Sequence, residues 1–189
     1  MIFTQENEYS AVLDACVLVP AALCDLLLRL GEEPAMYRPF WSEHILMEMA
    51  RALKTKLNRT AEEIAHKQRE MNKAFPEAMV IAPKSLVAAL DGIRDKGDRP
   101  VLAAAIVAHA NVIVTQNTRH FPKDYLEEYG ILCQNADEFL IHQFHLGGQL
   151  VLDKLDDQAA GITKSRDYVI RSLRNAAPGF AELVEGHRL

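Results

Sequence analysis

The chain has 189 residues, of which 49% are hydrophobic and 25% are charged, so it is long enough to bury a substantial core. Its 21 basic and 26 acidic residues give a formal net charge of −5, which argues against a strongly basic body wrapped by nucleic acid. The three cysteines form no C-x-x-C pair, which excludes a disulfide scaffold. Composition leaves open a local basic groove, or an acidic pocket that works with bound cations.

The first ten residues, MIFTQENEYS, contain acids and lack the apolar core of a signal peptide. No apolar run in the sequence approaches the ~18 residues that a membrane span requires. We therefore expect a cytoplasmic protein with no membrane partner.

Predicted strands and helices alternate along most of the chain. Short apolar or β-branched runs indicate the strands, and apolar residues spaced three and four apart indicate the helices. The strands are expected at residues 11–13, 79–81, 112–115 and 131–133, and the helices at 20–31, 43–57, 60–75, 85–94 and 101–110. From Gly147 onward only helices are predicted, the last near 179–185. This order predicts an α/β sandwich with a mainly parallel sheet and a C-terminal helical extension.

Several oxygen-bearing side chains should meet at one edge of this sheet. Ligands bind at the carboxyl ends of the strands in open parallel sheets, and Asp14 ends the first strand. Thr115 and Asn117 follow a later strand at the same edge. The helix before that strand runs toward the opposite edge, so Asp98 at its beginning returns to the first edge. An aspartate at a helix start is also a common N-cap, and Asp98 can serve both roles.

A further acid is expected from the helix that Ser42 begins. Glu43 and Glu48 both lie roughly 100° from the centre of its apolar face, on opposite sides. Only one of them can face the site, and periodicity does not choose between them.

Three segments carry a resemblance to a known family: VLDACVL, SEHILMEMARAL and KGDRPVLAAAIVAHANVIVTQNTRHFP. In this order they resemble the PIN-domain nucleases, and among these the VapC-type ribonuclease toxins of toxin–antitoxin pairs. The resemblance covers about residues 8–143 and implies a three-layer α/β/α sandwich with a mainly parallel central sheet. Residues 147–189 are similar to the helical extension of a longer VapC-like subgroup.

The resemblance implies an endoribonuclease that hydrolyses RNA phosphodiester bonds and leaves a 5′-phosphate and a 3′-hydroxyl. It implies that Asp14, Glu48 and Asp98 are acidic ligands of Mg²⁺ or Mn²⁺, hard cations that prefer carboxylate oxygens. Asn117 stands where many members carry a fourth aspartate, so it would offer a neutral carbonyl and weaken metal binding. Thr115 would hydrogen-bond Asp14 or orient the attacking water.

Basic side chains near the acids are expected to contact the RNA. Arg99, Arg119 and His120 flank the acidic cluster in the sequence and could hold phosphates, which would give an acidic protein a local basic rim.

Two protein partners are implied by the resemblance. A cognate antitoxin would hold the toxin inactive, and antitoxins of this family dock against the first long helix, where Leu27, Leu28 and Leu30 would face an antitoxin helix. VapC-like domains usually pair, so a homodimer is expected.

Two alternative functions are suggested by single residues. Asn117 motivates a catalytically weak PIN domain that acts as an RNA-binding or protein-interaction module. An aspartate after the first strand is also typical of haloacid-dehalogenase-like phosphatases, but these need a second aspartate two residues later, where this chain has Cys16.

Overall fold

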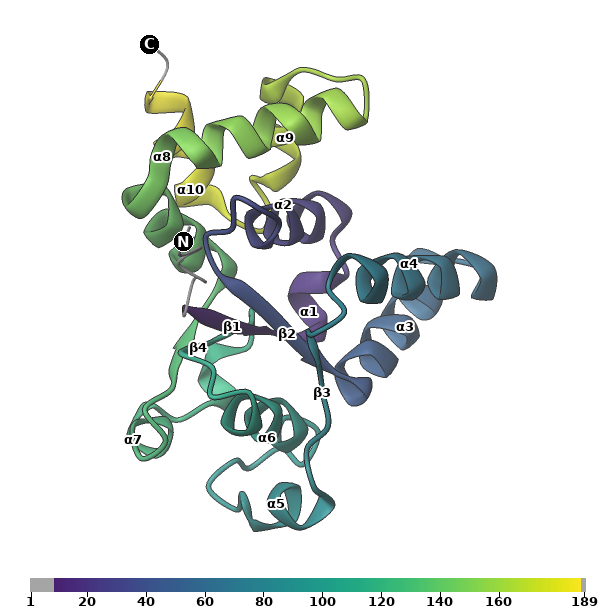
Figure 1. Cartoon of the computed structure of the whole chain (residues 1–189), viewed down its shortest axis with the longest axis vertical. Helices are drawn as coiled ribbons and strands as arrows, with labels where there is room; N and C mark the ends of the chain where they lie inside the picture. Colours follow the sequence, from purple (N-terminus) through teal and green to yellow (C-terminus); the bar gives the residue numbers. More distant parts are fainter. Residues whose placement is uncertain (1–8, 188–189) are drawn as a thin grey trace, which may run out of the picture.

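The computed structural model describes residues 9–187, and its five strands form one parallel sheet (Figure 1). The strands are β1 Ser10–Leu13, β2 Arg38–Ser42, β3 Met79–Val80, β4 Val112–Val114 and β5 Leu132–Gln134. Their spatial order is β3-β2-β1-β4-β5. The chain winds outward from β1 to β3 and then restarts on the other side of β1. This change of direction makes the carboxyl ends of β1 and β4 the topological switch point of the sheet, the usual ligand position in such sheets.

Helices cover both faces of the sheet. They are α1 Ala15–Leu18, α2 Ala21–Gly31, α3 Glu43–Leu57, α4 Ala61–Ala74, α5 Lys84–Ala89, α6 Arg99–Val107, the 3₁₀ turn η1 Thr118–His120, α7 Lys123–Glu127, α8 Ala136–Gly161, α9 Arg166–Leu173 and α10 Pro178–Gly186. α6 packs across β1, β2 and β4, whereas α2 and α8 lie on the opposite face (Figure 1). The predicted sandwich with added C-terminal helices is therefore confirmed. Among the described residues, no helix is both long and apolar enough to cross a membrane.

Local capping chemistry sets the ends of the two helices after β2. The Ser42 hydroxyl accepts the Ile45 N–H at the start of α3, and Asn58 ends that helix with a left-handed φ of 51°. Thr60 and Glu63 form the reciprocal capping box of α4. These predicted boundaries are confirmed.

Strand β2 was not predicted, because proline usually excludes a central strand. The Arg38 N–H donates to the Tyr9 carbonyl toward β1, whereas the Trp41 N–H donates to the Ala78 carbonyl toward β3. Backbone groups alternate in direction along a strand, so Pro39 faces the β3 side. β3 is only two residues long and pairs at Trp41 and Ser42, so no bond is lost at Pro39.

Three helix predictions differ in detail from the structure. α5 ends at Ala89 rather than near residue 94, and α6 begins at Arg99 and ends at Val107. α7 lies in the stretch after Pro122, for which no helix was predicted. It spans five residues, too few to show an apolar period in the sequence.

The C-terminal helices begin inside a helix rather than after a linker. α8 continues through a kink at Gly147 (φ −156°, ψ 58°), where the extension was expected to start. Its second half is joined to α2, because Lys154 Nζ donates to the Glu32 carbonyl at 2.9 Å and Gln158 Nε2 donates to the Ala22 carbonyl at 2.9 Å. Residues 1–8, used to argue against a signal peptide, and residues 188–189 of the extension lie outside the described part of the chain.

This packing corrects the expectation for the leucines of α2. Leu27 and Leu30 are completely buried, Leu28 is half-buried against the core, and α8 and α9 pack on this helix. These side chains are therefore not available to an antitoxin in this structure. The apolar stripe was visible in the sequence, but a stripe does not reveal which segment covers it.

Candidate metal centre

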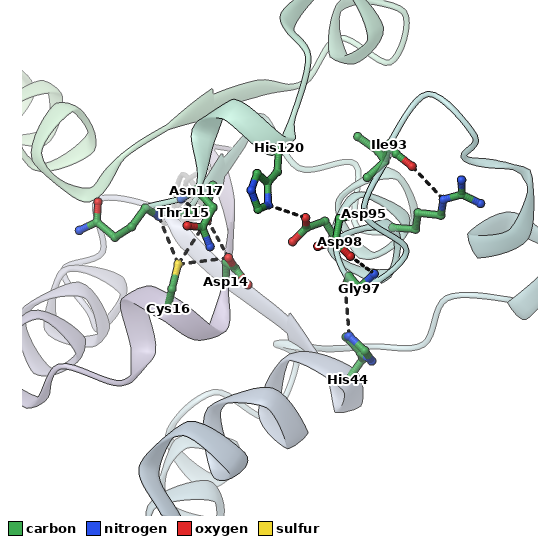
Figure 2. A network of polar contacts seen from close by, with 12 residues as sticks. Asp14, Cys16, His44, Ile93, Asp95, Gly97, Asp98, Thr115, Asn117 and His120 are labelled. Carbon is green, nitrogen blue, oxygen red and sulfur yellow. Dashed lines mark hydrogen bonds and ion pairs between the residues drawn. The ribbon is translucent and has the colours of Figure 1, made fainter. Parts of the chain in front are cut away.

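Asp14 lies at the carboxyl end of β1, next to the end of β4, where hydrogen bonds hold both its carboxylate and its backbone. Its carboxylate accepts the Ala15 N–H at 2.6 Å, as the N-cap of α1, and the Thr115 hydroxyl at 2.7 Å. Its own N–H donates to the Val114 carbonyl at 3.1 Å. The residue is only 7% exposed, and a buried carboxylate needs such partners (Figure 2). The ends of two strands and the start of a helix thus orient this acid.

Cys16 supplies a further bond to Asp14 and was missed as a site residue. Its Sγ donates to Asp14 Oδ2 at 3.1 Å, and it is half-buried. Burial, reinforced by the charge of Asp14, raises the pKa of this thiol to about 12, so it stays protonated as a donor. The signal was available, because residue 16 lies in the first turn of the helix that Asp14 caps.

The two other residues predicted at this edge lie close to Asp14. Thr115 is completely buried, and its hydroxyl also accepts the Asn117 N–H at 3.1 Å. Asn117 is half-buried and lies beside Thr115 in the close-up view (Figure 2). We call Asp14, Cys16, Thr115 and Asn117 the strand-end group.

A second group forms around Asp98 at the beginning of α6. Asp98 occupies the N-cap position but makes no side-chain capping bond. Its carboxylate is instead bonded to His120 Nδ1 at 2.8 Å (Figure 2). Asp95 joins them, and one ligand atom of each of these three residues lies within 4.8 Å of the others. We call Asp95, Asp98 and His120 the helix-start group.

Two members of the helix-start group are predicted site residues, Asp98 as a metal ligand and His120 as an RNA contact. Asp95 is not among the predictions. Asp95 accepts the Gly97 N–H at 2.8 Å, which forms the tight turn that brings it back toward Asp98. An aspartate two residues before a glycine is an ordinary turn signal, so nothing in the pattern marked it as part of a site.

The electrostatics of Asp98 favour a bound cation. Burial raises the pKa of its carboxyl group, the bond and charge of His120 lower it, and the negative charges of Asp95 and Asp14 raise it further. Asp14 and Asp98 therefore repel each other across one space, on whose border His120 lies (Figure 2). A divalent cation between them would relieve that repulsion.

The structure does not draw either glutamate of α3 into these groups. Glu48 is exposed and forms an ion pair with Arg51 at 3.6 Å, and Glu43 is exposed in the first turn. Within residues 9–187, neither is a member of the acidic group around Asp98. The choice of Glu48 therefore stays a prediction from the resemblance.

The basic residues predicted to contact RNA lie near the acids. Arg99 is half-buried in the first turn of α6, where its Nε donates to the Ile93 carbonyl at 3.0 Å. Arg119 is exposed in η1, next to His120. Their contact with RNA stays a prediction.

The sequence and the fold together define the class of protein. The PIN domain family profile matches residues 10–119, a span that runs from β1 into the turn η1 and includes every member of the two groups except His120, and the chain belongs to this family of nucleases. A 49-residue segment is 51% identical to VapC50, named as a candidate ribonuclease, of Mycobacterium tuberculosis (strain ATCC 25618 / H37Rv). That match covers 26% of this chain and 29% of the relative, so it spans less than a third of the relative's length.

Proposed function

We propose that this protein is a Mg²⁺- or Mn²⁺-dependent endoribonuclease that acts as the toxin of a toxin–antitoxin pair. The proposal depends mainly on one observation, the acidic helix-start group near the carboxyl ends of parallel strands, with Asp14 close enough for its charge to raise the pKa of Asp98. Membership of the PIN family and the local similarity to VapC50 support the same reaction.

The donor atoms fit a hard divalent cation. Asp14 and Asp98 would hold it, with Asp95 adjacent to Asp98 and the Asn117 side chain offering a neutral oxygen. Glu48 would complete the set, as the family resemblance implies. When bound, Mg²⁺ or Mn²⁺ would neutralise phosphate charge and activate a water molecule.

The remaining side chains position the acids and the substrate. The Thr115 hydroxyl and the Cys16 thiol fix the orientation of the Asp14 carboxylate, and His120 holds that of Asp98. Arg99 and Arg119 contact phosphates of the RNA. Water then adds to phosphorus, the bond from phosphorus to the 3′-oxygen breaks, and that oxygen takes up a proton.

The substitution Asp14→Asn tests this proposal. It keeps an oxygen that can cap α1, so the fold should survive, but it removes the charge that holds the cation. We expect the rate of RNA cleavage to fall at least about a hundredfold in titrations with Mg²⁺ and Mn²⁺. Circular dichroism checks the fold of the variant.

Two results would contradict the proposal. An Asp14→Asn variant that cuts RNA as fast as the parent would remove Asp14 from the reaction. A parent protein that cuts no RNA with either cation would favour the binding module that Asn117 suggested.

The two glutamates of α3 provide a matched pair. Glu48→Gln should lower the cleavage rate about tenfold or more, because it removes a ligand charge, whereas Glu43→Gln should change it less than about twofold. Cleavage rates at subsaturating Mn²⁺ compare them. The reverse order would transfer the role to Glu43.

The toxin role requires a partner that suppresses cleavage. A short neighbouring reading frame that encodes a small DNA-binding protein would support an antitoxin, and the purified pair should lack ribonuclease activity. Because α8 and α9 cover α2, this antitoxin must dock elsewhere on the molecule. By the family resemblance we also propose a homodimer.

A further inference from the structure

A groove of about 1000 Å³ lies beside the proposed metal centre. It is bordered by α3, by β3 and the residues after it, by α5 and by the start of α6 (Figure 1). Aliphatic side chains line much of it, among them Leu46, Met47, Met79, Ile81 and Val87. Met47 is 56% exposed and Ile81 is 85% exposed, values unusual for such large apolar groups. This surface is therefore suited to a ligand with apolar faces.

The charges of the groove are opposite in sign to those of the whole chain. Lys84, Lys96 and Arg99 line it together with a single acid, Glu43, whereas the chain has a net charge of −5. In the described part of the chain neither lysine takes part in an ion pair. The groove is thus a local cationic region that complements a polyanion.

The groove reaches the sequence neighbours of the helix-start group, although none of that group's three residues lines it. Lys96 and Arg99 flank Asp98 in the sequence, and both border the groove. The imidazole of His44, another lining residue, is bonded through Nε2 to the Gly97 carbonyl at 3.2 Å (Figure 2). This contact ties α3 to the turn that carries the acids. A chain of nucleotides that leaves the proposed metal centre past Lys96 and Arg99 would therefore reach the groove.

We propose that this groove binds the nucleotides next to the scissile phosphate of a single-stranded RNA. The inference extends the proposed ribonuclease function and depends on it. Phosphates lie against Lys84, Lys96 and Arg99, and unstacked bases pack on the aliphatic side chains around Met47 and Ile81. A double helix presents its phosphates outward and its bases stacked, so it cannot use the apolar part of the groove.

Binding of a labelled single-stranded RNA oligonucleotide to the Asp14→Asn protein tests the proposal. Fluorescence anisotropy in EDTA measures the affinity without cleavage. Lys84→Glu should weaken binding at least about fivefold. It should also reduce the slope of log affinity against log salt concentration by about one, because one fewer counterion is released. Lys164→Glu changes the net charge equally in the connection between α8 and α9, outside the groove, and should weaken binding less than about twofold. Equal losses in both variants would overturn the proposal.

A second variant separates base contacts from phosphate contacts. Ile81→Ser changes an exposed side chain without removing core, so the protein should fold. We expect it to weaken binding of single-stranded RNA about threefold and to leave binding of inorganic polyphosphate unchanged. If Lys84→Glu and Ile81→Ser both leave RNA affinity unchanged, the groove does not bind RNA, and an acidic protein segment becomes the better occupant.

These measurements are independent of cleavage. Loss of binding in Lys84→Glu, together with a parent protein that cuts no RNA, would support the groove and refute the nuclease. If the parent protein cuts RNA but Lys84→Glu leaves RNA binding unchanged, the groove proposal is refuted and the nuclease proposal is not.

Discussion

The strand-end group and the helix-start group hold their aspartates in different ways. Asp14 is 7% exposed, and strand ends, a helix start and a thiol fix it. The Asp98 side chain is 16% exposed, its partner His120 is 32% exposed, and both come from turns rather than strands. The first group therefore determines orientation through rigid backbone, whereas the second responds to charge and protonation. Substitutions in the two groups should therefore have effects that separate these two roles.

The largest of these effects is expected in the strand-end group. Thr115→Val removes the hydroxyl that donates to Asp14 and accepts from the Asn117 N–H, so both partners lose their bond. We expect cleavage to fall roughly tenfold to a hundredfold, as for other residues that orient a metal ligand. Thr115→Ser keeps the hydroxyl and should recover most of the rate. Rates of RNA cleavage measure both, and a Thr115→Val variant as active as the parent, with the loss found in Thr115→Ser instead, would show that Thr115 only fills space.

An intermediate and pH-dependent effect is expected in the helix-start group. His120 lowers the pKa of Asp98, which burial raises, so His120→Gln should raise that pKa further. A carboxyl group must lose its proton to bind a cation, so affinity falls as the pH drops through this pKa. We expect Mn²⁺ affinity at mildly acidic pH to decrease about threefold to tenfold in the variant. Calorimetric titration across the pH range measures this.

The raised pKa of Asp98 has the opposite pH dependence in its effect on the folding stability of the metal-free protein: metal binding weakens as the pH falls, whereas this contribution to stability is lost as the pH rises. A raised folded-state pKa means that the folded protein holds the Asp98 proton more tightly than the unfolded chain. This contribution to stability is complete below the ordinary pKa and is lost as the pH rises through the raised value. A pH profile of Mn²⁺ binding in His120→Gln identical to that of the parent would contradict the role of His120.

The smallest effect is a gain. Asn117→Asp restores a negative charge beside Asp14, so the Mn²⁺ concentration that gives half-maximal cleavage should fall about twofold to fivefold. Gln116→Glu adds the same charge one residue away on a side chain that is directed to the Ala176 carbonyl, and it should have little effect. An unchanged Mn²⁺ requirement in Asn117→Asp would mean that residue 117 does not face the cation.

Local chemistry made much of the fold predictable. The cap at Ser42 and the box of Thr60 and Glu63 depend on neighbouring residues, and the structure confirms both. The meeting of Asp14 with Thr115 followed from the rule that parallel strands end at one edge. β2 could not be predicted in this way, because its formation despite Pro39 depends on a distant element: β3 is so short that it does not pair at Pro39, and no backbone hydrogen bond is lost there.

The parts of the site that sequence reasoning missed depend on local turns and helix starts that the hydrophobic pattern does not mark. Asp95 reaches Asp98 only because a turn folds back, and Cys16 reaches Asp14 only because a helix starts directly after the strand. The leucines of α2 were assigned to a partner because periodicity cannot distinguish a surface that another protein covers from one that the chain covers itself.

The kinked helix α8 has a thermodynamic consequence. In its first half, which packs on the sheet side, the ring of Phe139 lies edge-on to the ring of Tyr37, with 5.0 Å between the ring centroids. Its second half carries Lys154 and Gln158, which bond to α2 and its C-terminal end. The two helical halves are separated only by the kink at Gly147, whose backbone is not helical. Melting of the C-terminal helices would strip apolar cover from α2 and fray the helix that contacts the sheet. We infer that the helices and the nuclease fold share one cooperative unfolding unit, in which stability gained at either end protects the acids at the centre.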